Sequence, residues 1–504
     1  MASNGFSDSI SAPNGQGMSN PRDISNALGS QSSFMANEMD RSDVIWGWGQ
    51  FIDHDINFND DNLTDTISIP VPPCDSMFDP NCTGTVKIRM FRSQTDPNSG
   101  TSTSNPLRHV NAITSFIDGS GVYGSTQARA DWLRTHAGGK LKMSTGNLLP
   151  WNTIDGEFAS AIDPTAPFML LDGSPLPTKY YIGGDIRINE QPGLTAFHTL
   201  WVREHNRLCD ELIVAHPSWS DEELFQRARK IVGALIQAVT YEEFLPSMGI
   251  HLPAWTSYDS AEEPQIFNMF SASAYRFGHT MINGNLIRYK EDGTAWGFGS
   301  VDLRDAFFNP LIIKDEGGIE PFFRGMAAQE HQMVDPLMMD DLRNFLFGPP
   351  GAGGLDLLAI NIQRARERGL PNYNTIRSDL SLTPHTSFAS LTSDVDLQNK
   401  ISMAYSHIDS IDPWVGFMSE DHLPGSIMGE GLQRILSLQF STLRKADRYY
   451  YENDPAFSPQ EINELKSTLL SKIMLRNTSI DTLQDSVFLA VPRNQIVTEL
   501  IPFR

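Results

Sequence analysis

The sequence is poor in cysteine and contains no long apolar run. Three cysteines occur in 504 residues and none forms a CxxC pair, which excludes a structural zinc site. No apolar stretch approaches the ~20 residues of a transmembrane helix. The first residues also lack the basic and apolar regions of a signal peptide. If the protein is secreted, as we expect below, its leader has been removed or it follows another export route.

Positive charge is also scarce. The chain has 38 Lys and Arg against 61 Asp and Glu, a formal net charge of −23. Nucleic acid and anionic membrane surfaces are therefore poor partners. The charges are dispersed along the chain, which mainly favours solubility.

The cysteines leave one question open. Cys74 and Cys82 lie in a segment rich in Pro and Asp and could close a short disulfide, which would favour an oxidising, extracellular compartment. Cys209 lies within a predicted helix, where we expect a small buried residue. Whether the first two are bonded stays open at this point, and secretion is an expectation.

The apolar pattern predicts a mainly α protein. Helical spacing covers residues 41–58, 191–214, 220–245, 266–275, 356–368, 427–452 and 458–475. Residues 60–105 are irregular and broken by prolines, and strand signals are few and short. No linker or repeat divides the chain. We therefore predict one large domain over residues 20–504, preceded by a flexible arm over residues 1–19 that is rich in Ser, Asn and Gly.

The most informative segment is residues 50–55, Gln-Phe-Ile-Asp-His-Asp. On a helix, Gln50, Asp53 and His54 share one face, while Asp55 points roughly 100° away from His54. The apolar residues before this segment indicate that it is buried. Buried carboxylates are costly unless their charge is compensated, which implies a cation or a cofactor.

Simpler interpretations exist for these and other residues taken singly. His54 alone would be an ordinary histidine, and the following residues imitate an EF-hand loop but have Phe58 where Gly is needed. His198 and His205 are not spaced as HExxH, so we expect buried structural histidines. The loop 348–354 lacks GK[ST] and is no phosphate site.

Interpretations that treat each residue separately do not explain why several motifs occur together in one order along the chain. These motifs occupy residues 20–26, 50–55, 114–120, 187–190, 198–207, 275–280, 361–364 and 420–425. In this order they resemble the animal-type haem peroxidases of the peroxidase–cyclooxygenase superfamily. The resemblance covers nearly the whole chain and implies a single haem peroxidase catalytic domain over residues 20–504, with few short strands. The chain would be a compact member of the family, such as a bacterial one.

The resemblance assigns a distal catalytic group. His54 matches the distal base, since a neutral imidazole can accept and return a proton near pH 7. Arg187 matches the cation that stabilises charge on the departing oxygen. Gln50 matches the family's distal glutamine, which helps to hold water or a halide.

On the proximal side, His279 matches the ligand of the haem iron and Asn361 its hydrogen-bond partner. Arg276 and Arg364 match arginines near the haem propionates. The family joins its haem, a derivative of haem b, to two carboxylates by esters, and Asp53 and Glu190 stand at those positions.

Three further features follow from the resemblance. Members with a third, sulfonium bond have Met where this chain has Gln191, which excludes that bond. Asn57 replaces an aspartate near a propionate, which puts that contact in doubt. The family's calcium site predicts oxygen ligands for Ca²⁺. These would come from Asp55, Thr114, the Phe116 carbonyl, Asp118 and Ser120.

We therefore expect a peroxidase that reduces hydrogen peroxide and oxidises bromide, iodide or thiocyanate rather than chloride, or phenolic donors. One alternative is a fatty-acid dioxygenase of the cyclooxygenase branch, but Tyr275 is not followed by that branch's His-Trp-His motif. Another is an adhesive or matrix protein on a peroxidase scaffold, which the presence of His54, Arg187 and His279 opposes. The sequence does not indicate an oligomeric state.

Overall fold

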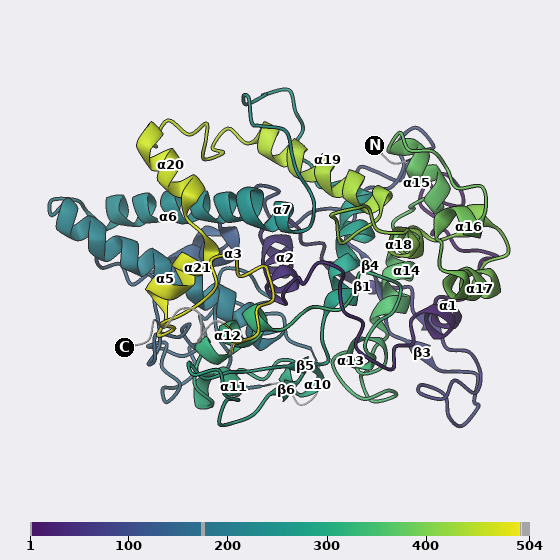
Figure 1. Ribbon diagram of the computed structural model, residues 1–504, viewed down its shortest axis with the longest axis horizontal. Coiled ribbons are helices and arrows are strands. Elements are labelled where there is room, and N and C mark those ends of the chain that lie inside the picture. The colour runs from purple at the N-terminus through teal and green to yellow at the C-terminus, as the bar shows by residue number, and fades with distance from the viewer. Residues whose placement is uncertain (1–2, 173–176, 494, 496–504) are drawn as a thin grey trace.

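Helices dominate the computed structural model, which describes residues 3–172, 177–493 and 495 (Figure 1). The long helices α5 (Pro192–Ala215) and α6 (Asp221–Ala238) pack together on one side of the molecule. Helix α2 (Val44–Ile56) lies near the middle, and shorter helices gather on the other side. The mainly α class with few short strands is confirmed.

Helix α2 is apolar on nearly all sides because it lies inside the core. Its residues Val44, Trp48 and Phe51 are fully buried. A helix that is apolar all round has to be buried, which carries His54 and Asp55 into the interior with it. The helix ends at Asn57, whose backbone is extended (φ −144°, ψ 120°).

The ends of α5 and α6 are set by local capping. The Gln191 side chain accepts a hydrogen bond from the Gly193 N–H, and a proline opens α5. Ser220 and Glu223 form a reciprocal capping box at the start of α6. Both helices begin where the sequence predicts them.

Helix α6 continues into a wider turn, the π-helix η1 (Val239–Phe244), followed by α7 (Leu245–Ser247). The Thr240 hydroxyl donates to the Ile236 carbonyl at 2.7 Å and accepts from the Trp48 indole N–H at 3.3 Å. This links η1 to α2. Turns of this kind are rare and are often found near functional sites.

The other helices are mostly short. They are α1 (Pro21–Leu28), α3 (Ser120–Tyr123), α4 (Gln127–Leu133), α8 (Asn268–Ala272), η2 (Ala274–Phe277), α9 (Gly278–Met281), α10 (Leu303–Ala306), α11 (Leu311–Asp315), α12 (Glu320–Ala328), α13 (Asp340–Arg343), α14 (Leu357–Glu367), α15 (Tyr373–Asp379), α16 (Phe388–Leu391), α17 (Val395–Ala404), η3 (Ile408–Ser410), α18 (Pro413–Ser419), α19 (Glu430–Ala446), α20 (Pro459–Ser467) and α21 (Leu470–Asn477). Helix α9 packs against α2, which matters for the site below.

The strands form three antiparallel pairs. They are β1 (Asp61–Thr66) with β4 (Phe91–Ser93), β2 (Ile69–Pro70) with β3 (Lys87–Ile88), and β5 (Asn285–Leu286) with β6 (Val301–Asp302). In their registers, Asp61 lies opposite Ser93, Ile69 opposite Ile88 and Asn285 opposite Asp302. The pairs are short, and Ile69 of β2 and Ile88 of β3 belong to a small apolar cluster apart from the main core.

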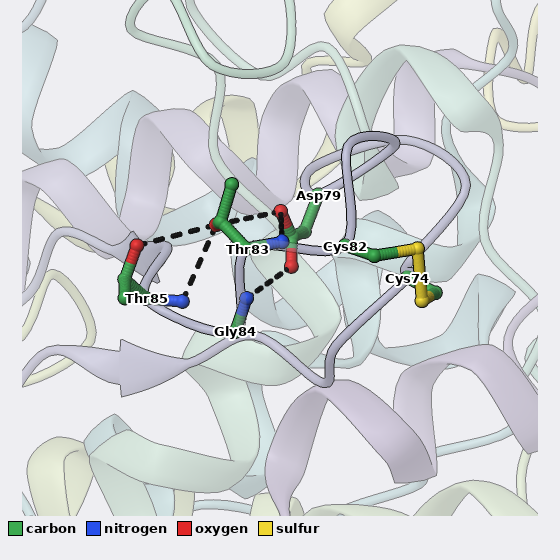
Figure 2. Close-up of a disulfide and its surroundings, with 6 residues drawn as sticks. All are labelled: Cys74, Asp79, Cys82, Thr83, Gly84 and Thr85. Atoms are coloured by element: carbon green, nitrogen blue, oxygen red, sulfur yellow. Dashed lines mark hydrogen bonds between the residues drawn. A yellow bond between two sulfur atoms is a disulfide. The ribbon is translucent and has the colours of Figure 1, made fainter.

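The open question of the cysteines is answered by the structure. Cys74 and Cys82 form a disulfide that closes a surface loop (Figure 2). Inside the loop the Asp79 carboxylate accepts hydrogen bonds from the Thr83 backbone N–H at 2.9 Å and the Gly84 N–H at 2.8 Å. Cys209 is free and buried in α5, as predicted.

Two predicted helices are interrupted. Residues 458–475 form α20 and α21, because the backbone at Thr468 is extended (φ −81°, ψ 107°) and the Leu470 N–H donates to the Glu243 carboxylate of η1 at 2.7 Å. Residues 266–275 form α8 and the 3₁₀ turn η2, because Ser273 leaves the helical region (φ −144°, ψ −70°). The single helices predicted there are wrong.

Residues 3–19 lie against the rest of the chain. The Gly5 N–H donates to the Gly369 carbonyl at 2.9 Å, and the Leu107 N–H donates to the Ile10 carbonyl at 2.7 Å. Phe6 is buried. The division into an arm over residues 1–19 and a domain over 20–504 stays a prediction. Among the described residues, no helix is long and apolar enough to cross a membrane.

Candidate active site

His54 of α2 is a buried, neutral histidine. Burial, and then the nearby Arg187 charge, lower the pKa of His54 well below its usual value. Its Nδ1 has no hydrogen-bond partner among the described residues and lies 3.6 Å from the Asp185 carboxylate. The imidazole can therefore accept a proton at neutral pH.

Arg187 is held beside His54 by an acid that the sequence analysis missed. Its Nε and one terminal nitrogen donate to the two oxygens of Asp185 at 2.9 and 2.8 Å, and a terminal nitrogen also donates to the Asn57 carbonyl at 3.1 Å. Burial alone would raise the pKa of Asp185, but Arg187 and His54 outweigh it and hold this pKa below its usual range. The only local signal was an acid two residues before the arginine, which is too common to be informative.

Gln50 connects two neighbours into one hydrogen-bonded row. Its amide nitrogen donates to the Glu190 carboxyl at 2.9 Å, and the Gln191 amide nitrogen donates to the Gln50 oxygen at 3.0 Å. Burial raises the pKa of Glu190 to about 7 and also raises the pKa of Asp53. Asp53 accepts a hydrogen bond from the Asn57 amide at 3.2 Å. Both carboxyls therefore favour the neutral form more than an exposed acid does.

His279 lies in the first turn of α9, and one of its two ring nitrogens makes a hydrogen bond. Its Nδ1 lies 3.2 Å from the Asn361 amide oxygen, which can only accept, so this nitrogen donates. Burial, and then Arg276, lower the pKa of His279 to about 3. Nε2 thus keeps its lone pair and makes no hydrogen bond in the part of the chain that the structure describes. A Cβ placed on Gly278 would meet no atom within 4 Å, which shows open space beside His279.

The site lies between α2 and α9, which are packed together. Several side chains of the site are partly exposed. Burial is nevertheless the main cause of the shift in their pKa values. This combination indicates that they border an internal space. They are Asp53, Glu190, Arg276 and His279.

Three arginines gather beyond His279. Burial, and then the charge of Arg364, lower the pKa of Arg276 to about 10 and of Arg368 to about 9. Two carboxylates face them, and Arg364 lies 3.1 Å from Asp61 and 3.3 Å from Glu367. The cluster keeps an excess of positive charge that suits an anionic group. Sequence reasoning found Arg276 and Arg364 but missed Arg368, one helical turn after Arg364.

Asp55 points away from His54 and into the loop 114–120. Its carboxylate accepts hydrogen bonds from the backbone N–H groups of Asp118 and Gly119, both at 3.1 Å, and of Gly121 at 2.7 Å. Burial, and then the Asp118 charge, raise the pKa of Asp55 to about 7. The structure thus brings together the two carboxylates that the sequence proposed as calcium ligands.

The other proposed ligands lie in the same loop. The Thr114 hydroxyl accepts from the Phe116 N–H at 3.0 Å, and the Ser120 hydroxyl donates to Asp55 at 3.3 Å. Within the described ranges, no three His, Cys, Asp or Glu side chains gather as a metal site. The expected set contains only two carboxylates, and its other oxygens come from hydroxyls and a carbonyl.

Comparisons with known proteins cover nearly the whole chain. The animal haem peroxidase family matches residues 1–488. Peroxinectin A from Dictyostelium discoideum is 34% identical over 496 residues, which cover 96% of this chain and 89% of that protein. The peroxidasin homolog of Mus musculus is 36% identical over 484 residues, 88% of this chain, but this chain spans only 32% of that protein.

Solved structures agree with these matches. Peroxidase A from Dictyostelium discoideum superposes with a TM-score of 0.89 at 33% identity, covering 97% of this chain and 94% of that one. A fatty acid alpha-dioxygenase from Oryza sativa has a TM-score of 0.76 at 22% identity, covering 93% and 80%. At that identity the dioxygenase shows a shared fold alone.

Proposed function

Because the chain belongs to the animal haem peroxidase family, we propose that it reduces hydrogen peroxide at a haem bound between α2 and α9. One observation carries this proposal. Two histidines on these packed helices, the buried His54 and the partly exposed His279, are both neutral, and His54 lies beside the Arg187 cation. A neutral base, a permanent cation and a free imidazole nitrogen are the groups that peroxide cleavage needs.

The residues fit a haem group. At the site, buried polar atoms that lack a partner among the described residues include His54 Nδ1, Asn361 Nδ2 and Arg364 Nε. The open space beside Gly278 and the excess positive charge of the arginine cluster suit a macrocycle with two propionates. We assign Nε2 of His279 as the iron ligand, with Arg276 and Arg364 at the propionates. Haem supplies the iron that takes up peroxide and the electrons that split its O–O bond.

The chain's own residues would move the proton and hold the charge. His54 accepts the proton of one peroxide oxygen and returns it to the other. Arg187 stabilises the charge on the departing oxygen, and Asp185 keeps its guanidinium in place. Stopped-flow absorption of the haem-loaded protein mixed with hydrogen peroxide tests this function. No change in the haem spectrum would contradict it.

Covalent attachment of the haem is a further part of the proposal. Burial makes charge costly at Asp53 and Glu190, and an ester removes that charge. We expect acid–acetone to leave haem on the wild-type protein and on Asp53→Asn or Glu190→Gln, each of which keeps one ester. The double variant should release it. Free release of haem from the wild type would refute the ester linkage.

We propose bromide, iodide, thiocyanate or phenols as electron donors, and chloride as a poor one. Gln191 cannot form a sulfonium bond, and its amide is engaged with Gln50 and with the Gly193 N–H at 2.6 Å. Turnover with each anion at equal concentration tests this order. Chloride oxidation as fast as bromide oxidation would contradict it.

We also propose a Ca²⁺ ion between Asp55 and the loop 114–120, with Thr114, Phe116, Asp118 and Ser120 as the other ligands. Two neighbouring buried carboxyls whose pKa values are both raised would be stabilised by a divalent cation. An extracellular location is consistent with the disulfide between Cys74 and Cys82.

A further inference from the structure

A row of aromatic rings leads away from the proposed haem site. Ring centroids of Tyr275 and Phe440 lie 6.0 Å apart, those of Phe440 and Tyr241 6.3 Å, and those of Tyr241 and Tyr450 5.4 Å. We call these four residues the aromatic ladder. All four are buried, so their rings are shielded from water. Electron transfer falls steeply with distance, and rings in contact therefore form the preferred route through a protein.

The inner end of the ladder borders the site. Tyr275 stands four residues before His279, and a Cβ placed on Gly49 of α2 would lie 3.9 Å from the Tyr275 hydroxyl. Gly49 directly precedes Gln50, so this phenol lies against the helix that carries His54. The Tyr275 hydroxyl has no hydrogen-bond partner in the described part of the chain.

The outer end of the ladder differs chemically from the inner one. The Tyr450 ring lies 4.8 Å from the ring of Tyr451, and the Tyr451 hydroxyl donates to the Glu242 carboxylate at 2.7 Å. Tyr241 and Glu242 are consecutive residues of η1. The π-helix η1 therefore contributes Tyr241 to the aromatic ladder, and its next residue, Glu242, accepts the hydrogen bond from the Tyr451 hydroxyl.

Proton acceptors decide where an oxidised tyrosine is stable. A phenol that loses an electron becomes strongly acidic, and in a buried place its proton needs a nearby acceptor. Among the described residues, Tyr275 has none and the Tyr241 hydroxyl donates to the Phe440 carbonyl at 3.1 Å. Two phenols at the outer end donate to carboxylates. Tyr450 donates to Glu452 at 3.2 Å, and Tyr451 donates to Glu242 at the shorter distance of 2.7 Å. Burial raises the pKa of Tyr451, so its phenol is neutral before oxidation.

A surface pocket of about 480 Å³ adjoins this end. Tyr449, which is 56% exposed, and Gln237 line it. The Gln237 amide oxygen accepts the Tyr451 backbone N–H at 2.9 Å, which ties Tyr451 to the pocket wall. Tyr258 also lines the pocket, so two phenol rings are available to stack against an aromatic donor.

We propose that Tyr451 is a second oxidation site, connected by the aromatic ladder to the proposed haem site, and that it oxidises phenolic donors bound in the pocket beside Tyr449. This inference rests on the proposed function, which supplies the oxidant. Tyr451 loses one electron to the peroxide-oxidised cofactor, and its proton passes to Glu242. A phenol in the pocket then gives one electron to the Tyr451 radical, Glu242 returns its proton to Tyr451, and the phenol releases its own proton to solvent and leaves as a phenoxyl radical.

The first test locates the radical. Haem-loaded protein is mixed with one equivalent of hydrogen peroxide and rapidly frozen, and its tyrosyl radical is recorded by electron paramagnetic resonance, because the buried Tyr451 ring is out of reach of an added spin trap. We expect a tyrosyl signal and its loss in Tyr451→Phe. Glu242→Gln, which removes the proton acceptor but keeps the ring, should lose it as well. Circular dichroism checks that each variant is folded.

The matched control is Tyr405→Phe. Tyr405 is also a buried tyrosine that donates to a carboxylate, Asp412, at 2.9 Å, but among the described residues no ring contact joins it to the ladder. This variant should keep the tyrosyl signal. A signal that persists in Tyr451→Phe, or equal losses in Tyr405→Phe and Tyr451→Phe, would overturn the inference. Absence of any reaction with peroxide would instead refute the proposed function.

The second test concerns the donor. A phenol attached to dextran is too large for the internal site, whereas iodide is small. Tyr449→Ala should lose oxidation of the dextran-bound phenol and leave iodide oxidation unchanged. Equal effects on both donors, or none on the dextran-bound phenol, would remove the pocket from the proposal.

Discussion

The two histidines of the proposed haem site are adjusted by their immediate surroundings. His54 and His279 are both neutral because burial disfavours the imidazolium, and an arginine near each adds to the effect. Their hydrogen bonds differ: Asn361 engages one ring nitrogen of His279, whereas His54 Nδ1 has no partner among the described residues. The first arrangement suits a metal ligand and the second a group that exchanges protons.

At the scale of a single residue, our prediction concerns His54, the proposed base. His54→Ala should slow the reaction with hydrogen peroxide by about 10²-fold or more, the size of a lost acid–base group. The rate is measured by stopped-flow absorption of the haem. His251→Ala, which removes an exposed histidine, is the control and should react like the wild type. An unchanged rate in His54→Ala would remove this residue from the mechanism.

At the scale of elements, α2 serves two sites at once. One of its faces carries His54, the proposed base, and the next residue, Asp55, is hydrogen-bonded to the loop 114–120. Because the two residues are joined by one peptide unit, a change in the position of the loop also moves His54. Chelation of Ca²⁺ should therefore perturb the haem absorption spectrum. Metal analysis by mass spectrometry confirms removal. An unaltered spectrum with the ion demonstrably gone would separate Asp55 from the haem site.

Local sequence signals determined some elements and not others. The capping box of Ser220 and Glu223 fixes the start of α6 independently of how the helix packs, because both residues lie within one turn. The break between α20 and α21 instead depends on Glu243, more than two hundred residues earlier, which takes the Leu470 N–H. No local pattern could predict that interruption.

The whole molecule contains buried histidines whose protonation opposes folding. Burial lowers the pKa of His205 to about 4 from an ordinary value of 6.5. As pH falls from 6.5 to 4, the unfolded chain binds a proton there before the folded one does, so the folded state loses stability. The loss reaches up to about 3 kcal/mol for this residue, at about 1.4 kcal/mol for each pH unit.

His205→Gln should remove that part of the pH dependence. Its free energy of unfolding should fall less between pH 7 and pH 4 than that of the wild type, measured by urea denaturation at several pH values. Buried acids such as Glu243, whose pKa is raised to about 7 by burial, act in the opposite direction. They are common to both proteins and cancel in the comparison. Parallel pH profiles would contradict the assignment.

The sequence by itself determined the mainly α class, the starts of α5 and α6, and the residues of the motifs that resemble the family, because apolar spacing, caps and motifs are local properties of the chain. Only the tertiary structure decided that Asp185 holds Arg187 beside His54, that Arg368 joins the arginine cluster and that Cys74 bonds to Cys82. These pairings depend on how the backbone folds and packs around them, and residue order alone does not specify their distances.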